Sequence, residues 1–395
     1  FQVKEVKFDF KKIMERSRKV AKQLSDGVTY LLKKNNVTVL TGTGKIISSK
    51  SVSIKDSSGK EEILSTKNII IATGSRPRIL PGLEPDGKLV MTYRDALSLK
   101  ALPKKLLIVG SGAIGIEFAS FYKNMGVEVS IVEMLDRVMP VEDVEVSQCI
   151  KSELEDQGIK IYLSSKVSSI EKNKNEVKTT LDVAGEKKVQ TFDSILVAVG
   201  IQSNVENIGL ENTKVKLDRG HIITNNWCET DEAEIYAIGD VASPPWLAHK
   251  ASHEGIICAN KIAGKKKVKP LNKNAIPSCV YSIPQVASVG LTEQEATKKG
   301  YKIKIGKFPF MGNGKAVAIG ETNGFVKTIF DDKTGELLGA HMVGAEVTEM
   351  IQGYVIAMTL EATEQELIHT VFPHPTLSEM MQESVLQAFD KAIHI

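Results

Sequence analysis

The stretch FPHPTLSE, residues 372–379, places a histidine between two prolines, with a glutamate five positions further along the chain. Proline fixes its own φ and restricts the residue before it, so His374 has little backbone freedom. A rigidly held imidazole with a carboxylate in reach is suited to taking up and returning a proton. We therefore single out His374 and Glu379 as a candidate acid/base pair. The same residues also fit a surface histidine beside a glutamate on the outside of a helix, and the segment alone does not decide between the two.

A glycine-rich turn near residue 110 has the spacing of a dinucleotide site. The segment GSGAIG supplies Gly110, Gly112 and Gly115, follows an apolar strand and opens a helix, and a second strand then ends at Glu133. Glycines let the backbone approach a pyrophosphate, and the start of the helix offers free N–H groups to it. The acid 18 residues beyond the third glycine can accept hydrogen bonds from both ribose hydroxyls and would repel a 2′-phosphate. The pattern predicts an NAD site, and a strand–helix turn without a ligand is the alternative.

Two further apolar strands end in small residues and glycine, in IIIATGS and IYAIGD. Such an end lets a backbone pass close to a ligand. Asp240, at the second of these ends, fits a carboxylate that bonds a sugar or ribitol hydroxyl, and it fits equally well the N-cap of the helix that follows. His249 and His253 lie four residues apart in that helix, which suits a metal-binding face. No third ligand is nearby, so we expect no metal site.

The elements that must position these residues alternate between strands and helices. Apolar positions at helical spacing in residues 11–35 predict an amphipathic helix with one face on a core, and NIIIATGS predicts a fully buried parallel strand. The strand, glycine turn, helix and strand around residue 110 predict a βαβ unit. From about Leu271 onward, a hairpin over residues 324–344 and clustered helices predict an α+β domain. Further helices are predicted over residues 144–158, 247–263, 347–360, 364–370 and 376–392.

Composition excludes some classes of protein. A chain of 395 residues with 42% hydrophobic and 25% charged residues is ordinary for two or three domains. The net charge of +3 does not imply nucleic acid as a partner, and the basic run GKKKVK, residues 264–269, indicates a solvated loop. No apolar stretch has the length and freedom from charge of a membrane span. The closest pair of the four cysteines is 21 residues apart, so we expect reduced thiols and no CxxC-type redox or zinc pair.

The motifs in combination resemble those of a known family. The order IATGS, GSGAIGIE, VAVG, YAIGD, LAHKASHEG and HPTLSE runs over the full length of the chain and is similar to that of the pyridine nucleotide–disulfide oxidoreductases. LAHKASHEG and HPTLSE resemble in particular the branch that oxidises dihydrolipoamide. The resemblance implies fold class α/β, with two Rossmann-like nucleotide-binding domains, for FAD and NAD, plus a C-terminal α+β dimerisation domain. The implied segments are 1–79 (the C-terminal part of the FAD-binding domain), 80–203 (NAD-binding), 204–271 (a central domain completing the FAD site) and 272–395 (the interface domain).

The resemblance also implies roles for individual residues. His374 would be the base that takes a thiol proton of the dithiol, acting across the subunit boundary on the partner's disulfide site, and Glu379 would hold its ring in one tautomer. Glu117 is expected near the flavin. The residues expected to line FAD are Gly44, Thr73, Gly74, Ser75, Asp240, Ala248 and His249. The residues expected to line NAD are Gly110, Gly112, Gly115, Glu133, Val167 and Gly200.

The sequence departs from the family pattern in several places. The family begins with a GxGxxG unit for FAD followed by a CxxxxC redox pair, and neither is in this sequence. Phe372 and Pro373 stand where the family usually has a further histidine and a small residue, and VGIQSN lacks the usual Arg and Pro after VG. Without the disulfide, the chain as written cannot carry electrons from a dithiol to a flavin. We therefore expect the sequence to be an incomplete part of a full enzyme.

The function that the resemblance implies is that of a homodimeric flavoprotein. It would oxidise protein-bound dihydrolipoamide with NAD as acceptor and serve the lipoyl domains of 2-oxoacid dehydrogenase complexes. The alternatives are another flavin disulfide reductase of the same fold, for glutathione or mercury, and a non-catalytic, NAD-binding dimeric module. Glu133 argues against an NADP-dependent glutathione reductase, because positive residues would be expected after that strand. The cysteine usage fits a bacterial cytoplasm, with the mitochondrial matrix as the alternative.

Overall fold

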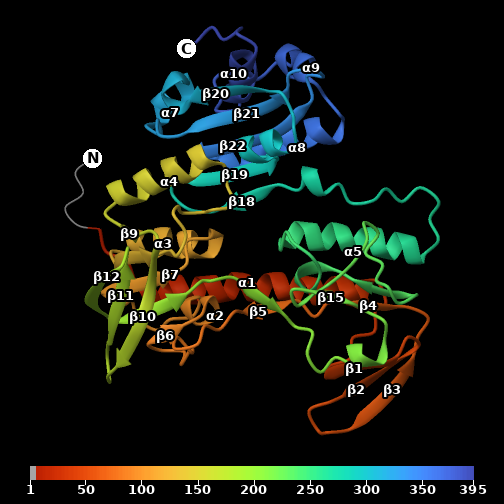
Figure 1. The fold of residues 1–395 in the computed structure, drawn as a ribbon. Coiled ribbons are helices and arrows are strands. Elements are labelled where there is room, and N and C mark those ends of the chain that lie inside the picture. The colour runs from red at the N-terminus through yellow and green to blue at the C-terminus, as the bar shows by residue number, and fades with distance from the viewer. Residues whose placement is uncertain (1–5) are drawn as a thin grey trace. The chain divides into compact units, whose positions relative to one another are not determined.

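The computed structural model describes residues 6–395, and the chain forms two compact units (Figure 1). The first five residues of the expected first domain lie outside this range. The finer division into four domains is not tested by the two units and stays a prediction. The first unit comprises the residues up to Arg78, Arg94–Leu102 and Gly200–Asn272, and the second comprises Ile79–Tyr93, Pro103–Val199 and Lys273–Ile395.

The first unit is built on short strands. They are β1 Thr43–Ser48, β2 Ser51–Lys55, β3 Glu61–Ser65, β4 Ile69–Ile71, β5 Ser75–Pro77, β14 Ile201–Ser203, β15 Leu217–Asp218, β16 His221–Ile222 and β17 Ile235–Ala237. A three-stranded antiparallel sheet has the order β1-β2-β3, while β14 pairs with β5 and β15 with β16, both antiparallel. β17 and β4 run parallel, so the two strands that end in ATGS and IGD finish at the same edge. The pairing therefore brings together two ends that the sequence analysis singled out.

β4 is open on one face. Ile69 and Ile71 are buried with Ile46 and Ile235 in one core, but Ile70 is 41% exposed. Because successive side chains of a strand point to opposite faces, the core covers only one face of β4. The prediction of a fully buried strand is wrong here, whereas β17 is buried at every position.

Helix α1, Phe10–Lys34, confirms the helix predicted over residues 11–35. None of its residues is buried, and Val20, Leu24 and Val28 of the apolar stripe are exposed. The prediction that one face lies on a core is therefore wrong for the described residues. The amphipathic spacing is present, but within residues 6–395 no element covers the stripe.

The second unit contains a parallel sheet of five strands in the order β6-β13-β7-β8-β9. Its strands are β6 Val90–Met91, β7 Lys105–Val109, β8 Glu128–Val132, β9 Lys160–Tyr162 and β13 Ser194–Val197. Helix α3, Ala113–Asn124, connects β7 to β8 and confirms the predicted βαβ unit. After their first residue, β7 and β8 are buried throughout, as expected for parallel strands that are covered on both faces.

A second, antiparallel sheet packs against the parallel one. It has the order β10-β11-β12, with β10 Ser165–Lys172, β11 Val177–Val183 and β12 Glu186–Phe192. Val177 and Leu181 share a buried core with Leu107 and Ile195 of the parallel sheet. Val109, the last residue of β7, belongs to the same core.

The C-terminal part of the second unit is an antiparallel sheet with helices. Its strands are β18 Ser278–Val280, β19 Gln285–Gly290, β20 Ile303–Pro309, β21 Phe325–Asp331 and β22 Leu337–Gly344, in the order β18-β19-β22-β21-β20. The hairpin β21–β22 confirms the one predicted over residues 324–344. Helix α8, Val347–Thr359, packs on β19 and β22, and α10, Glu379–Ala388, packs on β20 and β21 (Figure 1). We call this sheet the interface sheet.

Helices lie on both faces of the interface sheet. Thr328 Oγ1 lies 2.8 Å from Ser384 Oγ of α10, whereas the neighbouring Lys327 bonds Asp143 at the start of α4, Val144–Asp156. Since adjacent side chains of a strand point in opposite directions, α10 and α4 cover opposite faces. The interface sheet is thereby attached to the parallel sheet within one unit.

Helices α5 Ala248–Ile262 and α9 Glu364–His369 follow the predicted positions closely. Three short helices were not predicted, and they are α2 Tyr93–Ala96, α6 Glu293–Lys298 and α7 Gly314–Ile319. α10 is shorter than the predicted helix over residues 376–392. It begins only at Glu379, because the carboxylate of that residue accepts the N–H of Thr376 and holds the preceding residues in a turn, and it stops before Asp390, whose φ is +56°.

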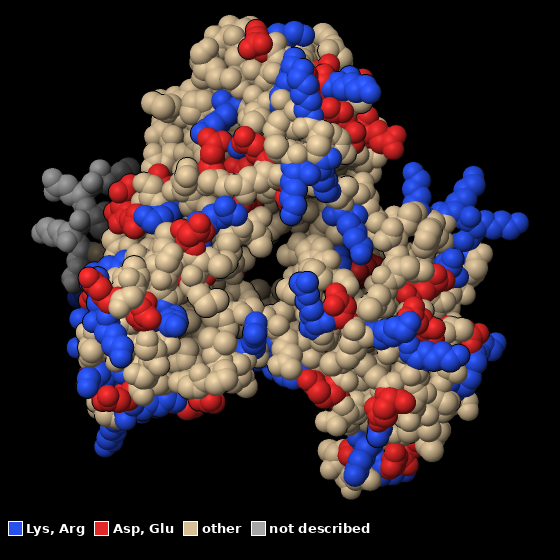
Figure 2. Space-filling model, viewed as in Figure 1, with Lys and Arg blue, Asp and Glu red and all other residues tan. Residues whose placement is uncertain are grey.

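The architecture confirms an α/β fold with a C-terminal α+β part. Over residues 6–395, no helix has both the length and the apolar character needed to cross a bilayer. Figure 2 shows Lys and Arg interspersed with Asp and Glu over the face in view, in keeping with the small net charge.

Candidate functional site

The turn between β7 and α3 is shaped by its three glycines in two different ways. A Cβ atom on Gly115 would lie 2.1 Å from the carbonyl oxygen of Gly110, and one on Gly110 would lie 2.5 Å from that of Ala198. Gly110 also has φ +101°, which other residues rarely adopt. These two glycines are required by the close packing of the turn itself.

Gly112, in contrast, is not required by packing within the turn. A Cβ atom placed there would meet no atom within 4 Å. Gly112 is also the N-cap of α3, and it provides no side-chain hydrogen bond to the first turn, so the N–H groups there are left to other partners. An open approach to uncapped N–H groups at a positive helix end fits a pyrophosphate.

Glu133, at the end of β8, is fastened to the glycine turn. Its Oε2 accepts the N–H of Ser111 at 2.9 Å and the hydroxyl of Ser111 at 2.7 Å, and its Oε1 accepts the N–H of Leu135 at 2.9 Å. The side chain is 9% exposed. The carboxylate therefore fixes the turn, and its contact with ribose hydroxyls stays a prediction.

The other residues predicted around NAD and the flavin lie in different surroundings. Glu117, in α3, is partly buried, which raises its pKa, while the N–H of Tyr281 donates to its Oε1 at 3.0 Å and opposes that shift. Val167, in β10, packs against the core of the parallel sheet. Gly200 belongs to the first unit, has φ +96° and accepts the N–H of Arg78. Their predicted contacts with the cofactors remain predictions.

The ends of β4 and β17 form the second candidate site. Ser75 Oγ donates to Asp240 Oδ2 at 2.9 Å, across 165 positions of sequence. Thr73 is held by Asn204, whose backbone oxygen accepts from Thr73 Oγ1 and whose amide donates to the Thr73 carbonyl. Gly74, between them, has φ +67°. The structure thus brings together four residues predicted to line FAD.

Asp240 is not the N-cap of the following helix. It lies in the short 3₁₀ turn Gly239–Val241, whereas the N-cap of α5 is Leu247. Of the two roles that the sequence left open, the capping role is therefore wrong, and a carboxylate presented to a ligand is the one that the structure allows.

A buried ion pair supports this turn from α5. Lys250 and Glu254, with side chains only 1% and 7% exposed, lie 3.0 Å apart, and Glu254 Oε2 accepts the N–H of Gly239 at 2.7 Å. Lys250 Nζ also donates to the carbonyl of Ser243 at 2.8 Å. The sequence analysis did not single out this pair. Its only signal is a Lys and a Glu four residues apart in KASHE, which usually indicates an exposed pair on a helix surface.

Three other residues predicted to line FAD are accessible. Gly44 lies in β1, and a Cβ atom there would meet nothing within 4 Å. Ala248 and His249 are exposed in the first turn of α5, which receives no hydrogen bond from the side chain of its N-cap. All three lie in the first unit together with Asp240.

His374 and Glu379 are hydrogen-bonded to each other, as predicted. His374 Nδ1 lies 2.9 Å from Glu379 Oε1, and the other carboxylate oxygen accepts the N–H of Thr376 at 2.8 Å. Partial burial disfavours the ionised form of Glu379, but the Thr376 N–H and the His374 ring outweigh it and hold the pKa of Glu379 below its usual value. An ionised carboxylate can only accept, so Nδ1 carries the hydrogen and the exposed Nε2 is the basic atom.

The cysteines do not form a redox pair. All four are free, and burial raises the pKa of Cys149 and of Cys258 to about 11 and raises the pKa of Cys279 as well. Thiols of high pKa are protonated at neutral pH and are weak nucleophiles. Cys149, Cys258 and Cys279 are therefore poor candidates for the dithiol chemistry.

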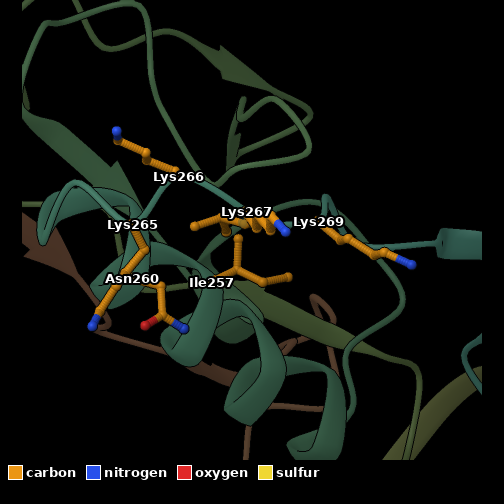
Figure 3. A pocket seen from close by; sticks show the side chains of 7 residues that line it. Ile257, Asn260, Lys265, Lys266, Lys267 and Lys269 are labelled. Atoms are coloured by element: carbon orange, nitrogen blue, oxygen red, sulfur yellow. The ribbon is translucent and has the colours of Figure 1, made fainter.

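The lysine-rich segment after α5 lines an open hollow. Lys265, Lys266, Lys267 and Lys269 surround a volume of about 550 Å³ above Ile257 and Asn260. Figure 3 shows Lys265, Lys266 and Lys269 pointing away from one another. Ammonium groups that diverge do not make a site for a single anion, and the segment fits the solvated loop that the sequence indicates.

Comparison with known proteins defines the class. A family model described as pyridine nucleotide-disulphide oxidoreductase matches residues 2–255, and the dimerisation domain of the same family matches residues 276–385. The chain therefore belongs to the pyridine nucleotide-disulphide oxidoreductase family.

Individual relatives narrow this further. The dihydrolipoyl dehydrogenase of Rhizobium etli is 51% identical over 98% of this chain and 84% of its own length. That of Zymomonas mobilis is 53% identical over 98% of this chain and 83% of its own length. Among solved structures, LpdA of Mycobacterium tuberculosis has a TM-score of 0.90 at 26% identity, covering 97% of this chain and 84% of its own.

The residues present fit the two nucleotides of this family, FAD and NAD. Gly112 leaves open space in front of the uncapped start of α3, as a pyrophosphate requires. Asp240 Oδ2 is held by Ser75, whereas no hydrogen bond to Oδ1 is found within residues 6–395, which suits a carboxylate aimed at a ligand hydroxyl.

Proposed function

We propose that this protein is a flavoprotein oxidoreductase of the dihydrolipoyl dehydrogenase type, which oxidises protein-bound dihydrolipoamide with NAD⁺ as acceptor. The observation that carries the proposal is the 2.9 Å hydrogen bond between His374 Nδ1 and Glu379 Oε1. It is supported by 51% identity to a dihydrolipoyl dehydrogenase over nearly the whole chain.

His374 supplies the base for the dithiol. A thiol is a poor nucleophile until it loses its proton, and a neutral imidazole with a free Nε2 can take that proton and later return it. Glu379 holds the ring so that Nε2 faces outward, and its negative charge stabilises the imidazolium that forms. The partly exposed position of the pair suits a substrate that arrives on another protein.

The overall reaction balances as a two-electron oxidation. The dithiol loses two electrons and two protons and becomes a disulfide, NAD⁺ takes up two electrons and one proton, and one proton is released. Bound FAD supplies a two-electron acceptor between the dithiol and NAD⁺. Gly112 and the start of α3 bind the NAD pyrophosphate, and Glu133 disfavours NADP because its carboxylate would repel a 2′-phosphate.

The activity also requires a redox-active cysteine pair. We assign that pair to none of the four cysteines in the sequence, because all four are free and widely separated along the chain, and burial raises the pKa of three of them. The proposal therefore includes a CxxxxC segment outside the 395 residues. The intact mass of the denatured polypeptide tests this part directly, since a mass of 43.2 kDa would leave no room for such a segment.

The partners follow from the same proposal. The dimerisation domain supports a homodimer, in which His374 acts on the disulfide site of the other subunit. The lipoyl domains of 2-oxoacid dehydrogenase complexes are the proposed carriers of the dithiol. The cytoplasm is the proposed location, with the mitochondrial matrix as the alternative.

The test is an assay of NADH formation from dihydrolipoamide by the purified protein, with NAD⁺ and NADP⁺ compared at equal concentration. We expect NADH formation with NAD⁺, loss of activity after FAD is removed and recovery when FAD is added back. Bound flavin with turnover only on glutathione or mercury would indicate another reductase of the fold. NAD affinity without bound flavin and without turnover would indicate a non-catalytic dimeric module.

A further inference from the structure

Asp240 is held at two points by two serines from neighbouring strands. Ser75, in β5, and Ser203, in β14, are directly opposite each other in the antiparallel pair. Ser75 Oγ donates to Asp240 Oδ2 at 2.9 Å, and Ser203 Oγ donates to the Asp240 backbone oxygen at 3.1 Å. The side chain and the main chain of Asp240 are therefore fixed independently.

The hydrogen bonds behind Ser203 have a single possible direction. A carbonyl oxygen can only accept, so the hydroxyl hydrogen of Ser203 points to Asp240. The Ser203 oxygen also makes a hydrogen bond with His221 Nδ1, and since its one hydrogen goes to Asp240 it accepts in that bond. His221 is thus the Nδ1–H tautomer, and the chain of donors runs from His221 through Ser203 to Asp240.

The ring of His221 is itself held in place. It stacks on Trp246 with ring centroids 4.6 Å apart and an interplanar angle of 25°. Trp246 Nε1 in turn donates to the carbonyl of Ala242 at 3.1 Å, two residues after Asp240. Trp246 therefore links the ring of His221 back to the chain segment that contains Asp240.

Ser203 is buried, so the hydrogen bonds of its hydroxyl cannot be replaced by bonds to water. Ser203 is 1% exposed, so its hydroxyl would lose a hydrogen bond without replacement if either partner were removed. Asp240 is only partly buried, and its Oδ1 is the carboxylate oxygen for which no hydrogen bond is found in the described part of the chain. Ser75 and Ser203 hold Oδ2 and the backbone of Asp240, so the other carboxylate oxygen is left available to a ligand.

We propose that Ser203 and His221 are positioning residues for the flavin: they hold Asp240 so that Oδ1 can accept a hydroxyl of the FAD ribityl chain. This deepens the flavin part of the proposed function and rests on it. It does not depend on which dithiol or disulfide the enzyme uses.

The experiment is a titration of the FAD-free full protein with FAD, followed by flavin fluorescence. The variants are Ser203→Ala and His221→Phe, the second of which keeps a ring to stack on Trp246 but lacks the Nδ1–H. Ser53→Ala is the matched control, because Ser53 is also a buried serine of the first unit, in β2, away from Asp240. We expect FAD to bind roughly 3- to 10-fold more weakly to both variants, the effect of one lost hydrogen bond, and less than twofold more weakly to the control.

A second set of measurements separates positioning from a general structural role. In an Asp240→Ala background no side-chain oxygen is left to accept the hydroxyl, so adding Ser203→Ala should change FAD affinity by less than twofold. An equal loss of affinity with and without Asp240, or loss in Ser53→Ala matching that in Ser203→Ala, would overturn the proposal. So would FAD affinities for Ser203→Ala and His221→Phe within twofold of the unaltered protein.

The outcome is distinguishable from failure of the proposed function. A protein that binds FAD through Asp240 but does not oxidise dihydrolipoamide would overturn the proposed function and leave this inference standing. A protein that binds no FAD at all would overturn the inference together with the flavin part of the function.

Discussion

Lys327 Nζ, on β21, lies 3.0 Å from Asp143 Oδ1 at the start of α4, and both side chains are almost completely buried. Glu145 and Glu293 each bring a carboxylate oxygen to within 2.7 Å of the same ammonium group. Three carboxylates on α4 and α6 thus share one lysine of the interface sheet. A buried charge is tolerated only when it is paired, so this lysine determines how α4 sits on the sheet.

Removing that lysine should be costly. We expect Lys327→Met to lower the free energy of unfolding by about 3–5 kcal/mol, because it leaves the buried carboxylate of Asp143 without its partner. Lys307→Met is the matched control. Lys307 pairs with Glu145 from a 42% exposed position on the next strand, and its loss should cost no more than about 1 kcal/mol. Urea unfolding of both variants measures the difference, and similar losses in the two would contradict this view.

Glu142 should make stability depend on pH. Burial raises its pKa from 4.5 to about 7, opposed by a hydrogen bond from Ser288 and assisted by the charges of Asp143 and Glu295. The folded state then holds a proton that the unfolded chain has already lost. The stabilisation is therefore full below about pH 4.5 and is lost as the pH rises to about 7, by roughly 3 kcal/mol.

Glu142→Gln should remove this dependence, because the amide stays neutral at every pH. Its unfolding free energy should exceed that of the unaltered protein at pH 8 and approach it at pH 5, when both are measured by urea titration. Glu295→Gln removes one of the charges that assist the shift, so it should keep a pH dependence of the same sign but a smaller one. A difference between Glu142→Gln and the unaltered protein that does not change with pH would rule out titration of Glu142 as the cause.

His374 and Glu379 should differ in their effects on turnover. His374→Gln removes the base and should lower kcat for dihydrolipoamide by about 10²–10⁴-fold. Glu379→Gln keeps an oxygen that can accept from Nδ1 but loses the charge that stabilises the imidazolium, so we expect a smaller loss. Reduction of a dye acceptor by NADH needs no thiol proton transfer and serves as the control reaction. A parallel loss in the dye reaction would show that the variants act through folding or cofactor loss instead.

Substitutions at two glycines of the turn between β7 and α3 should have different effects, one on NAD binding and the other on stability. Gly112→Ala adds a methyl group where the protein has open space, so it should leave the melting temperature unchanged and weaken NAD binding at least tenfold by occupying the place of the pyrophosphate. Gly115→Ala would put Cβ 2.1 Å from the Gly110 carbonyl oxygen and should lower stability by about 1–3 kcal/mol. Calorimetric NAD titration and thermal unfolding of both variants provide the check. Unchanged NAD affinity in Gly112→Ala would remove this turn from the proposed site.

Features that depend on local sequence were predicted well. The glycine turn between β7 and α3 and the bond between His374 and Glu379 join residues that are close along the chain, and both are present. The positions of the longer helices were predicted to within a few residues, because the apolar periodicity that defines them is itself local. The short helices α2, α6 and α7 span too few residues to show that periodicity and were not predicted.

Features that depend on distant partners could not be predicted in this way. Lys327 and Asp143 are 184 residues apart, and neither shows in its own segment that it will be buried. Ser203 and His221 lie on different strands that meet only in the fold, and the spacing of Lys250 and Glu254 is shared by countless exposed helix pairs. For helix α1 the sequence predicted a contact that is not found in the part of the chain that the structure describes. Its apolar spacing predicts a covered face but does not identify what would cover it, and none of its residues is buried.

The lysine cluster also limits how the second unit can move. Swinging the interface sheet away from α4 would pull the ammonium group of Lys327 out of reach of its carboxylates while water is still excluded, and that separation is steeply unfavourable. The parallel sheet and the interface sheet should therefore move together as one rigid body. A hinge between these two sheets is therefore not expected to open the way for a nucleotide to Gly112.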